Sequence, residues 1–177
     1  MANKAVCRFE KVSYEEFKKA WIKSGYEDYE EDIKLIYDGI KLPQRSSKRS
    51  SGYDFFYPDT VDGYIDKGSS WLIPTGIRCV FLEDGYDLSI YPRSGMGFKY
   101  RFHLDNTVGI IDNDYFESDN EGHIMIKVSC DPRNYDKIIL KAGAKFAQGI
   151  IREFFLAEGD DEIEKEDRNG GMGSTGE

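Results

Sequence analysis

From Tyr53 onward the chain alternates short hydrophobic segments with turn-forming residues, and this pattern constrains the fold most. Valine, isoleucine, phenylalanine and tyrosine dominate the segments, and these residues favour strands. The spacing of the segments and the turn residues between them predict an antiparallel sandwich or jelly roll rather than alternating β/α units. The segments read YDFFYP, SSWLIPTGIRCVFLEDGYDLSIYPRSG, TVGIIDNDYF, HIMIKVSC, KIILKAG and KFAQGIIREFFLA.

A chain of 177 residues suits one such domain with a small insertion. At this length a fold buries roughly 70% of the surface of its unfolded chain, so it needs no disulfide or metal to hold it together. The cysteines, Cys7, Cys79 and Cys130, are widely spaced and indicate neither a disulfide framework nor a zinc site. This cysteine usage favours a reducing, cytoplasmic location.

The charge and hydropathy of the chain argue against two classes of partner. The formal net charge of −9 argues against general binding to nucleic acid. No hydrophobic run approaches the ~20 residues that a membrane-spanning helix needs, and no signal peptide is recognisable. A small anionic substrate remains compatible with this charge if a few local cations, and a divalent metal carried with the substrate, neutralise it.

A helical insertion is predicted at about residues 13–40, after a short first strand at residues 2–9. Ser13 and Glu16 form a capping-box pattern, and Gly25 is expected to stop the first helix. The hydrophobic residues at helical spacing in this first helix are Phe17, Ala20 and Trp21.

A second helix is predicted at about residues 27–38. Both helices are expected to pack on the sheet, and binding of an unidentified protein partner is the alternative. The following stretch, QRSSKRSSG at 44–52, is basic and serine-rich, so it is interpreted as a solvated loop or as a contact for phosphate. The residues that share one face of the second helix are Tyr29, Ile33, Ile36 and Tyr37.

The stretch YPRSGMGFK, residues 91–99, combines an opened backbone with cations and a hydroxyl. The glycines leave backbone N–H groups accessible beside Arg93, Ser94 and Lys99. This combination would make a phosphate cradle. A tight, solvated turn is the alternative interpretation.

Two further stretches are weak signals on their own. SGYDF places Asp54 just after a glycine turn, where an aspartate is also a common turn former. KAGAKFAQG offers Lys145 and Gln148 between strands, and by itself this indicates no function.

The stretch NTVGIIDNDYF, residues 106–116, places Asp112 directly after a hydrophobic strand, with Asp114 and Tyr115 following. A carboxylate at a strand end beside an aromatic ring could orient a water and support a sugar. An ordinary hairpin turn rich in aspartate and asparagine is the alternative.

The C-terminal stretch DRNGGMGSTGE cannot pack into a core, because glycine carries no side chain and loses much entropy on ordering. The acidic run EGDDEIEKED before it is expected to repel itself and stay extended as a linker. The tail is either a disordered terminus or a flexible arm whose N–H groups, hydroxyls and Arg168 wrap an anion. We therefore predict a β domain at residues 1–158, and a linker with a flexible arm at residues 159–177.

In this order, and with WLIPTGI (71–77) between the first two, these five stretches resemble the five motifs of the homotrimeric dUTPases. The resemblance runs from about Ser51 to Gly176 and implies a distorted β jelly roll that assembles as a homotrimer. One active site would take motifs one, two and four from one subunit, motif three from a second and the tail from a third. The implied reaction is hydrolysis of dUTP with Mg²⁺ to dUMP and pyrophosphate, which keeps uracil out of DNA and supplies dUMP.

The resemblance also implies roles around the triphosphate. Asp54 would hold magnesium through water, because the phosphates themselves carry the metal. The residues that would bind the phosphates are Arg93, Ser94, Gly95 and Gln148.

Around the base and the sugar, the resemblance implies three further roles. Asn106 and the backbone of the hairpin that begins there would read the uracil edge. Tyr115 would stack under the deoxyribose and clash with a 2′-hydroxyl, which excludes UTP. Asp112 would act as general base on the water that attacks the α-phosphorus.

In the tail, Arg168, Ser174 and Thr175 would close over the γ-phosphate. An arm that orders only when the triphosphate is bound would exclude water and align the attack. Met172 stands where many family members carry a phenylalanine that stacks on the base, and its thioether can still cover a uracil.

The fourth motif also departs from the family, because its usual Gly-Asp-Arg reads Gly143-Ala144-Lys145 here. Lys145 keeps a positive charge without the planar guanidinium fork. These departures and the extra helices motivate an alternative, a regulatory protein that binds dUTP and a protein partner without much turnover. Deamination of dCTP is a further alternative on a related fold, and the third stretch disfavours it because DNDYF supplies no glutamate for the pyrimidine amine.

Overall fold

The computed structural model describes residues 4–26, 29–131, 133 and 137–165. Strands dominate it, and every pair of neighbouring strands in its sheets is antiparallel. The predicted antiparallel jelly roll is therefore confirmed. The largest sheet has the order β2 (Gln44–Arg45), β3 (Tyr53–Phe56), β12 (Lys145–Glu153), β7 (Tyr86–Pro92) and β9 (Gly109–Ile111).

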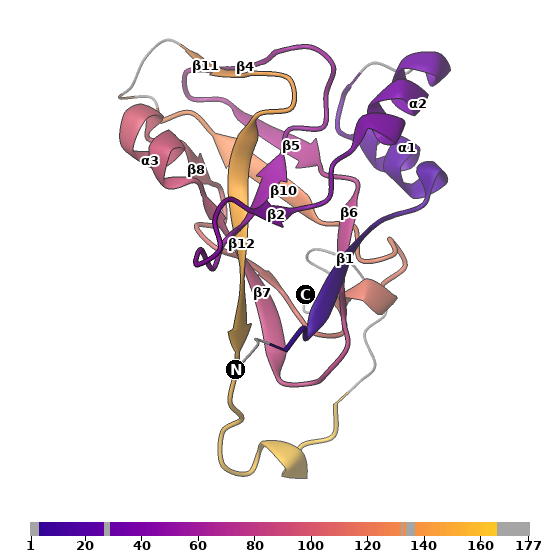
Figure 1. The fold of residues 1–177 in the computed structure, drawn as a ribbon, viewed down its shortest axis with the longest axis vertical. Coiled ribbons are helices and arrows are strands. Elements are labelled where there is room, and N and C mark those ends of the chain that lie inside the picture. The colour runs from indigo at the N-terminus through magenta and orange to yellow at the C-terminus, as the bar shows by residue number, and fades with distance from the viewer. Residues whose placement is uncertain (1–3, 27–28, 132, 134–136, 166–177) are drawn as a thin grey trace.

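Smaller sheets complete the barrel around this one. Figure 1 shows β12 running through the middle of the molecule, with α3 on one side and α1 and α2 together on the other. The remaining strands are β5 (Ser70–Pro74) with β10 (Met125–Ser129) and β8 (His103–Leu104), β1 (Cys7–Lys11) with β6 (Ile77–Phe81), and β11 (Lys137–Leu140) with β4 (Gly63–Asp66).

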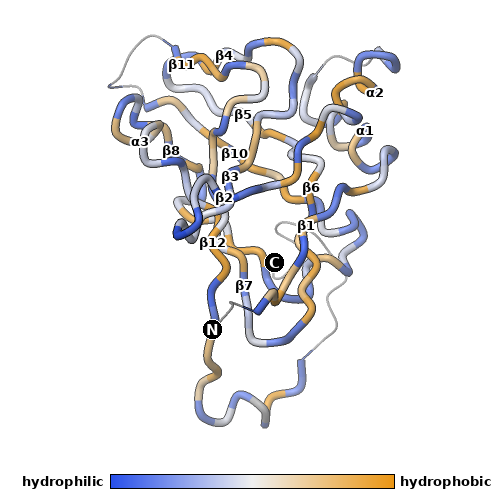
Figure 2. The backbone as a smooth tube through the Cα atoms, viewed as in Figure 1, coloured by the Kyte–Doolittle hydropathy of each residue, from blue (hydrophilic) through white to orange (hydrophobic). Residues whose placement is uncertain are grey.

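The helical insertion consists of α1 (Tyr14–Lys23) and α2 (Glu30–Gly39). As predicted, Ser13 caps α1, and its hydroxyl accepts a hydrogen bond from the backbone N–H of Glu16 at 3.2 Å. The predicted hydrophobic face of α1 is buried. Figure 2 shows hydrophobic and hydrophilic residues on both helices, as expected for helices with one face on a core.

The hydrophobic face predicted for the second helix is confirmed in part. Ile33 and Ile36 are buried, and Tyr37 is partly buried against them. Tyr29 is 67% exposed, so its place on the buried face was wrong. The reason is that Tyr29 is the N-cap residue, outside the helical turn that carries the hydrophobic face. Residues 27–28, where the helix was expected to begin, lie outside the described residues.

Aromatic contacts attach the insertion to the barrel. The rings of Trp21 and Tyr26 stack with 4.0 Å between their centroids. Tyr26 in turn meets the edge of Trp71 on β5, at 5.7 Å. These contacts confirm that the helices pack on the sheet.

Two boundaries differ from the sequence predictions. The first strand is β1, Cys7–Lys11, instead of residues 2–9, because it pairs in register with β6 from Cys7 opposite Phe81 to Lys11 opposite Ile77. The acidic linker is not wholly extended, because Asp160–Glu162 form a 3-10 turn. Lys165 folds back onto this turn, with 2.8 Å between its Nζ and Asp160 Oδ2, and offsets the repulsion there. The division at residue 158 stays a prediction.

Within the described residues, none of the helices has the length and hydrophobicity that a membrane crossing requires.

Candidate functional site

A buried carboxylate between two cations lies at one end of the largest sheet. Asp54, on β3, is 4% exposed. Arg93 Nε lies 3.0 Å from its Oδ1, and Lys145 Nζ lies 2.9 Å from its Oδ2. β3 and β7 both pair with β12, so the sheet brings together three stretches that are far apart in the sequence.

The surroundings of Asp54 keep it ionised. Burial works to raise the pKa of the Asp54 carboxyl, but the hydrogen bond from Ser46 and the charges of Lys145 and Arg93 outweigh burial. The pKa of Asp54 therefore lies below its usual value. Two cations and one carboxylate leave the cluster with a net positive charge.

Ser46 is a member of this cluster that sequence reasoning missed. Its hydroxyl donates a hydrogen bond to Asp54 Oδ2 and accepts one from Lys145 Nζ at 2.7 Å. The available signal was the set of hydroxyls and cations in QRSSKRSSG, for which a phosphate contact was one interpretation. Lys145, which alone indicated no function, is brought to Ser46 from 99 positions away.

Gln148 of β12 lies beside the cluster. It pairs with Asp54 of β3 on one side and with Tyr91 of β7 on the other. Its Nε2 donates a hydrogen bond to the carbonyl of Pro92 at 3.2 Å. Gly52 leaves room for this side chain, because a Cβ there would lie 2.5 Å from Gln148 Oε1. The amide is thus held at the edge of the charged cluster.

Ser94 and Gly95 open a helix, α3 (Ser94–Tyr100), so the alternative interpretation of this stretch as a tight, solvated turn was wrong. The helix closes because the N–H of Phe102, itself buried, donates to the carbonyl of Met96 at 3.3 Å. The first N–H groups of a helix have no partner within it, so Ser94 and Gly95 still present donors beside Arg93.

Asp112 lies at the other end of the same sheet. It follows β9, in which Ile111 pairs with Leu88 of β7, so Asp112 is level with Asp87. Asp87 and Arg93 are six residues apart along β7, which is about 20 Å at the rise of a strand. Asp112 is exposed and lines a hollow of about 600 Å³ together with Asp84, Asp87 and Phe154.

Tyr115 begins the short 3-10 helix η1 (Tyr115–Glu117) and is 5% exposed. Its hydroxyl donates to the carbonyl of His123 at 3.1 Å, and Asn120 Nδ2 donates to that hydroxyl at 2.9 Å. The ring is therefore held firmly. Asn106, in the turn between β8 and β9, is exposed and lies at the end of β9 opposite to Asp112.

The predicted tail residues, Arg168, Met172, Ser174 and Thr175, lie outside the described residues.

The described groups divide into two half-sites. One half-site, with Arg93 and Lys145, suits phosphate oxygens, which can replace the Asp54 carboxylate as partner of both cations. The other carries Asp112 and Tyr115. In one chain the two half-sites are too far apart to act on the same phosphorus.

Comparisons with known proteins place these features in one family. The sequence model of the dUTPase family matches residues 38–176. The deoxyuridine 5'-triphosphate nucleotidohydrolase of Lactococcus lactis is 39% identical over 141 residues, covering 78% of this chain and 89% of that protein. The enzyme of the same name from Ralstonia pickettii is 37% identical over 150 residues, covering 82% and 97%.

A solved structure agrees with these sequence matches. The crystal structure of dUTPase from Streptococcus mutans has a TM-score of 0.60 and 28% identity, over 85% of this chain and 98% of that one. The ordered motifs, the jelly roll and these relatives lead to the same assignment, and the chain belongs to the dUTPase family.

Proposed function

We propose that this protein hydrolyses dUTP to dUMP and pyrophosphate, by attack of water on the α-phosphorus. The activity keeps uracil out of DNA and supplies dUMP. The observation that carries the proposal is the buried Asp54 carboxylate between Arg93 and Lys145, in a chain whose curated relatives carry the name of this activity.

In this proposal the triphosphate replaces Asp54 as the partner of the two cations in the cluster. Phosphate oxygens accept hydrogen bonds from Arg93 and Lys145 in place of Asp54, and the N–H groups of Ser94 and Gly95 add to them. Gln148 donates to the phosphate chain from the adjacent strand. Lys145 supplies the charge that the family pattern provides at this position with an arginine, so the altered fourth motif still serves phosphate binding.

Magnesium fits this half-site as an ion carried by the substrate. Among the described residues there is no group of three or more His, Cys, Asp or Glu side chains placed to hold a metal by themselves. A hard cation that keeps its waters and binds phosphates needs one or two carboxylates, and Asp54 offers one once the phosphates engage its cations. Bound there, magnesium would neutralise charge on the triphosphate.

The reacting water needs a base from another copy of the chain. Asp112 and Tyr115 of one subunit complete the half-site of a neighbour in a homotrimer, because about 20 Å separates the two ends of β7 within one subunit. Exposed hydrophobic side chains supply surface for contacts between copies, and Phe155 is 85% exposed and Leu156 68%. Asp112 accepts the proton of the water, and Tyr115 presents a fixed ring to the sugar.

The glycine-rich arm completes the site over the γ-phosphate, with Arg168, Ser174 and Thr175 as donors and Met172 over the base. Asn106 and its hairpin read the uracil edge. Each of these assignments comes from the position of the residue in the family motifs.

Pyrophosphate release with dUTP, dTTP, dCTP and UTP, each with and without Mg²⁺, tests the proposal. Fast release from dUTP, and from none of the other three nucleotides, supports the proposal. Tight dUTP binding without release indicates the alternative, a regulatory dUTP sensor with a protein partner. Release of ammonia from dCTP indicates the deaminase instead.

A further inference from the structure

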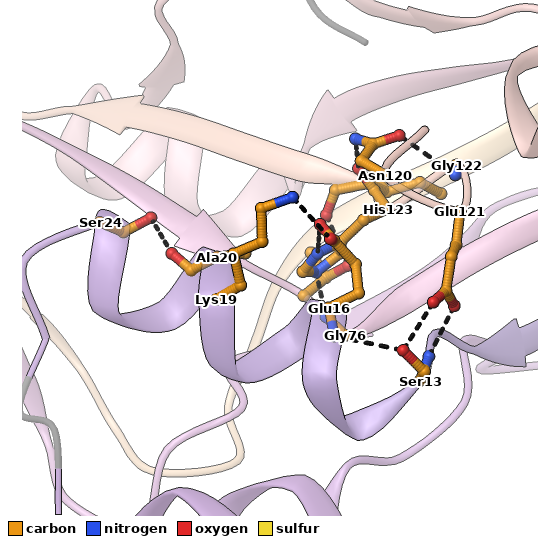
Figure 3. A network of polar contacts seen from close by, with 12 residues as sticks. Ser13, Glu16, Lys19, Ala20, Ser24, Gly76, Asn120, Glu121, Gly122 and His123 are labelled. Atoms are coloured by element: carbon orange, nitrogen blue, oxygen red, sulfur yellow. Dashed lines mark hydrogen bonds and ion pairs between the residues drawn. The ribbon is translucent and has the colours of Figure 1, made fainter. Parts of the chain in front are cut away.

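Helix α1 is clamped to the loop that follows Tyr115 (Figure 3). At the start of the helix, Glu121 accepts two hydrogen bonds from the capping residue Ser13, one from its N–H at 2.7 Å and one from its hydroxyl at 2.6 Å. These bonds join residues 108 positions apart in the sequence. A carboxylate at a helix N-terminus is also favoured by the helix dipole.

One turn further along α1, Glu16 faces a buried histidine of the same loop (Figure 3). His123 is fully buried, and its Nε2 accepts the N–H of Gly76 at 2.9 Å. In neutral His123 the ring proton must therefore be on Nδ1. Nδ1 is buried without a hydrogen-bond partner among the described residues, and Glu16 Oε1 is 3.6 Å away. Glu16 is the acceptor that faces this proton.

The clamped loop, residues 118–123, holds Tyr115 through hydrogen bonds. The Tyr115 hydroxyl bonds both to the carbonyl of His123 and to Asn120. Gly122, with φ of +71°, packs so closely on the start of η1 that a Cβ would lie 2.4 Å from Phe116 Cα. A displacement of the loop would therefore be transmitted directly to the Tyr115 ring.

Most of the insertion, including all of α1, precedes the region matched by the dUTPase sequence model, which begins at residue 38. The loop that it clamps lies inside that region. The contact thus joins an element outside the family pattern to the loop that holds Tyr115, a residue of the third motif.

We propose that α1 is a positioning element for sugar selection, in which Glu16 and Glu121 hold the 118–123 loop and thereby fix Tyr115. This inference rests on the proposed function. Tyr115 can reject the additional 2′-hydroxyl of UTP only if its ring stays in place. The contacts of Glu16 and Glu121 with the loop prevent the displacement of the ring that would admit this hydroxyl. Glu16 and Glu121 touch no substrate, so their effect falls on discrimination between sugars more than on turnover of dUTP.

Three variants of the full chain test the proposal. Glu16→Ala removes the acceptor for His123, and Glu16→Gln keeps an acceptor oxygen. Glu30→Ala is the matched control, because Glu30 accepts from the Tyr14 hydroxyl at 2.6 Å and pairs with Lys18, which are contacts between the helices that include no residue of the loop. Each variant is assayed for kcat and KM with dUTP and with UTP.

We expect Glu16→Ala to lower the preference for dUTP over UTP, as a ratio of kcat/KM values, by roughly tenfold. Glu16→Gln should restore most of the preference, and Glu30→Ala should leave it within about twofold even if it lowers the unfolding temperature. An unchanged preference in Glu16→Ala, or an equal loss in Glu30→Ala, would overturn the proposal, since the second result would mean general loosening of the helices.

Hydrogen exchange of the unliganded protein separates this proposal from the proposed function. Faster exchange at residues 115–123 in Glu16→Ala, but not in Glu30→Ala, supports the clamp even if the wild type proved inactive on dUTP. Equal exchange in all variants would overturn the clamp while leaving the activity untouched. Glu121→Ala, which removes both acceptors of Ser13, supplies a second route if Glu16→Ala does not fold, with the same expected change in preference and exchange.

Discussion

At the scale of single residues, Asp112 and Asp54 both lie at or near the ends of strands, yet their surroundings differ. Asp54 is buried and its oxygens are engaged by Ser46, Arg93 and Lys145. Asp112 is exposed at the edge of an open hollow. Its exposure lets solvent reach the Asp112 carboxylate, which is what the proposed role of Asp112 as general base requires.

Asp112→Asn should lower kcat for dUTP by about 10³-fold with little change in KM, because a general base contributes about 10²–10⁴-fold and the amide keeps the shape of the site. Steady-state pyrophosphate release measures this effect. Asp119→Asn, an exposed aspartate of the same region, is the control and should retain its rate. A near-normal rate in Asp112→Asn would remove Asp112 as the base.

The depressed pKa of Asp54 gives a pH dependence of known sign. A carboxyl whose pKa is lower in the folded state stabilises the fold above its unfolded pKa of about 3.9, and this stabilisation is lost as pH falls through the folded value. Asp54→Asn should therefore be less stable than the wild type at pH 7, and the difference should narrow below about pH 4. Urea unfolding across this range measures it, and a difference independent of pH would contradict the role of these ion pairs.

At the scale of elements, the tight packing of Gly122 on η1 makes the loop after Tyr115 sensitive to one methyl group. Gly122→Ala should lower the free energy of unfolding by about 3 kcal/mol, from a positive φ and a clash with backbone atoms. Gly85→Ala is the matched control, because Gly85 has φ of +84° and a Cβ added there would meet nothing within 4 Å, so it should lose about 1 kcal/mol. Equal losses in thermal unfolding would mean that the close packing contributes nothing.

What the sequence could predict among these elements was local. Helix α1 was predictable because its cap and its hydrophobic face lie within a dozen consecutive residues. Helix α3 was not, because Gly95 and Gly97 disfavour a helix and the burial of Phe102 outweighs that preference. The contacts of Ser46 with Lys145, and of Ser13 with Glu121, depend on strand pairing and docking across long separations, which no local pattern encodes.

At the scale of the whole molecule, the register of the largest sheet determines which groups can share a site. β9 pairs with the early part of β7, so the residue after β9 is at the far end from Arg93. The order of the motifs along the chain gives no sign of this separation. If Arg93 and Asp112 act on the same phosphate group, as we propose, a complete site takes its two half-sites from two copies of the chain.

Mixed trimers test that requirement. Arg93→Ala and Asp112→Asn should each be nearly inactive alone, because each removes one half of every site. When the two variants are unfolded and refolded together at equal amounts, about a quarter of the sites should combine an intact Arg93 from one subunit with an intact Asp112 from another, and activity should return to that fraction. Pyrophosphate release before and after mixing measures it, with light scattering to establish the trimer. A site built within one subunit would leave every site of the mixture with one defect, so the absence of any recovery in well-folded mixed trimers would contradict the shared site.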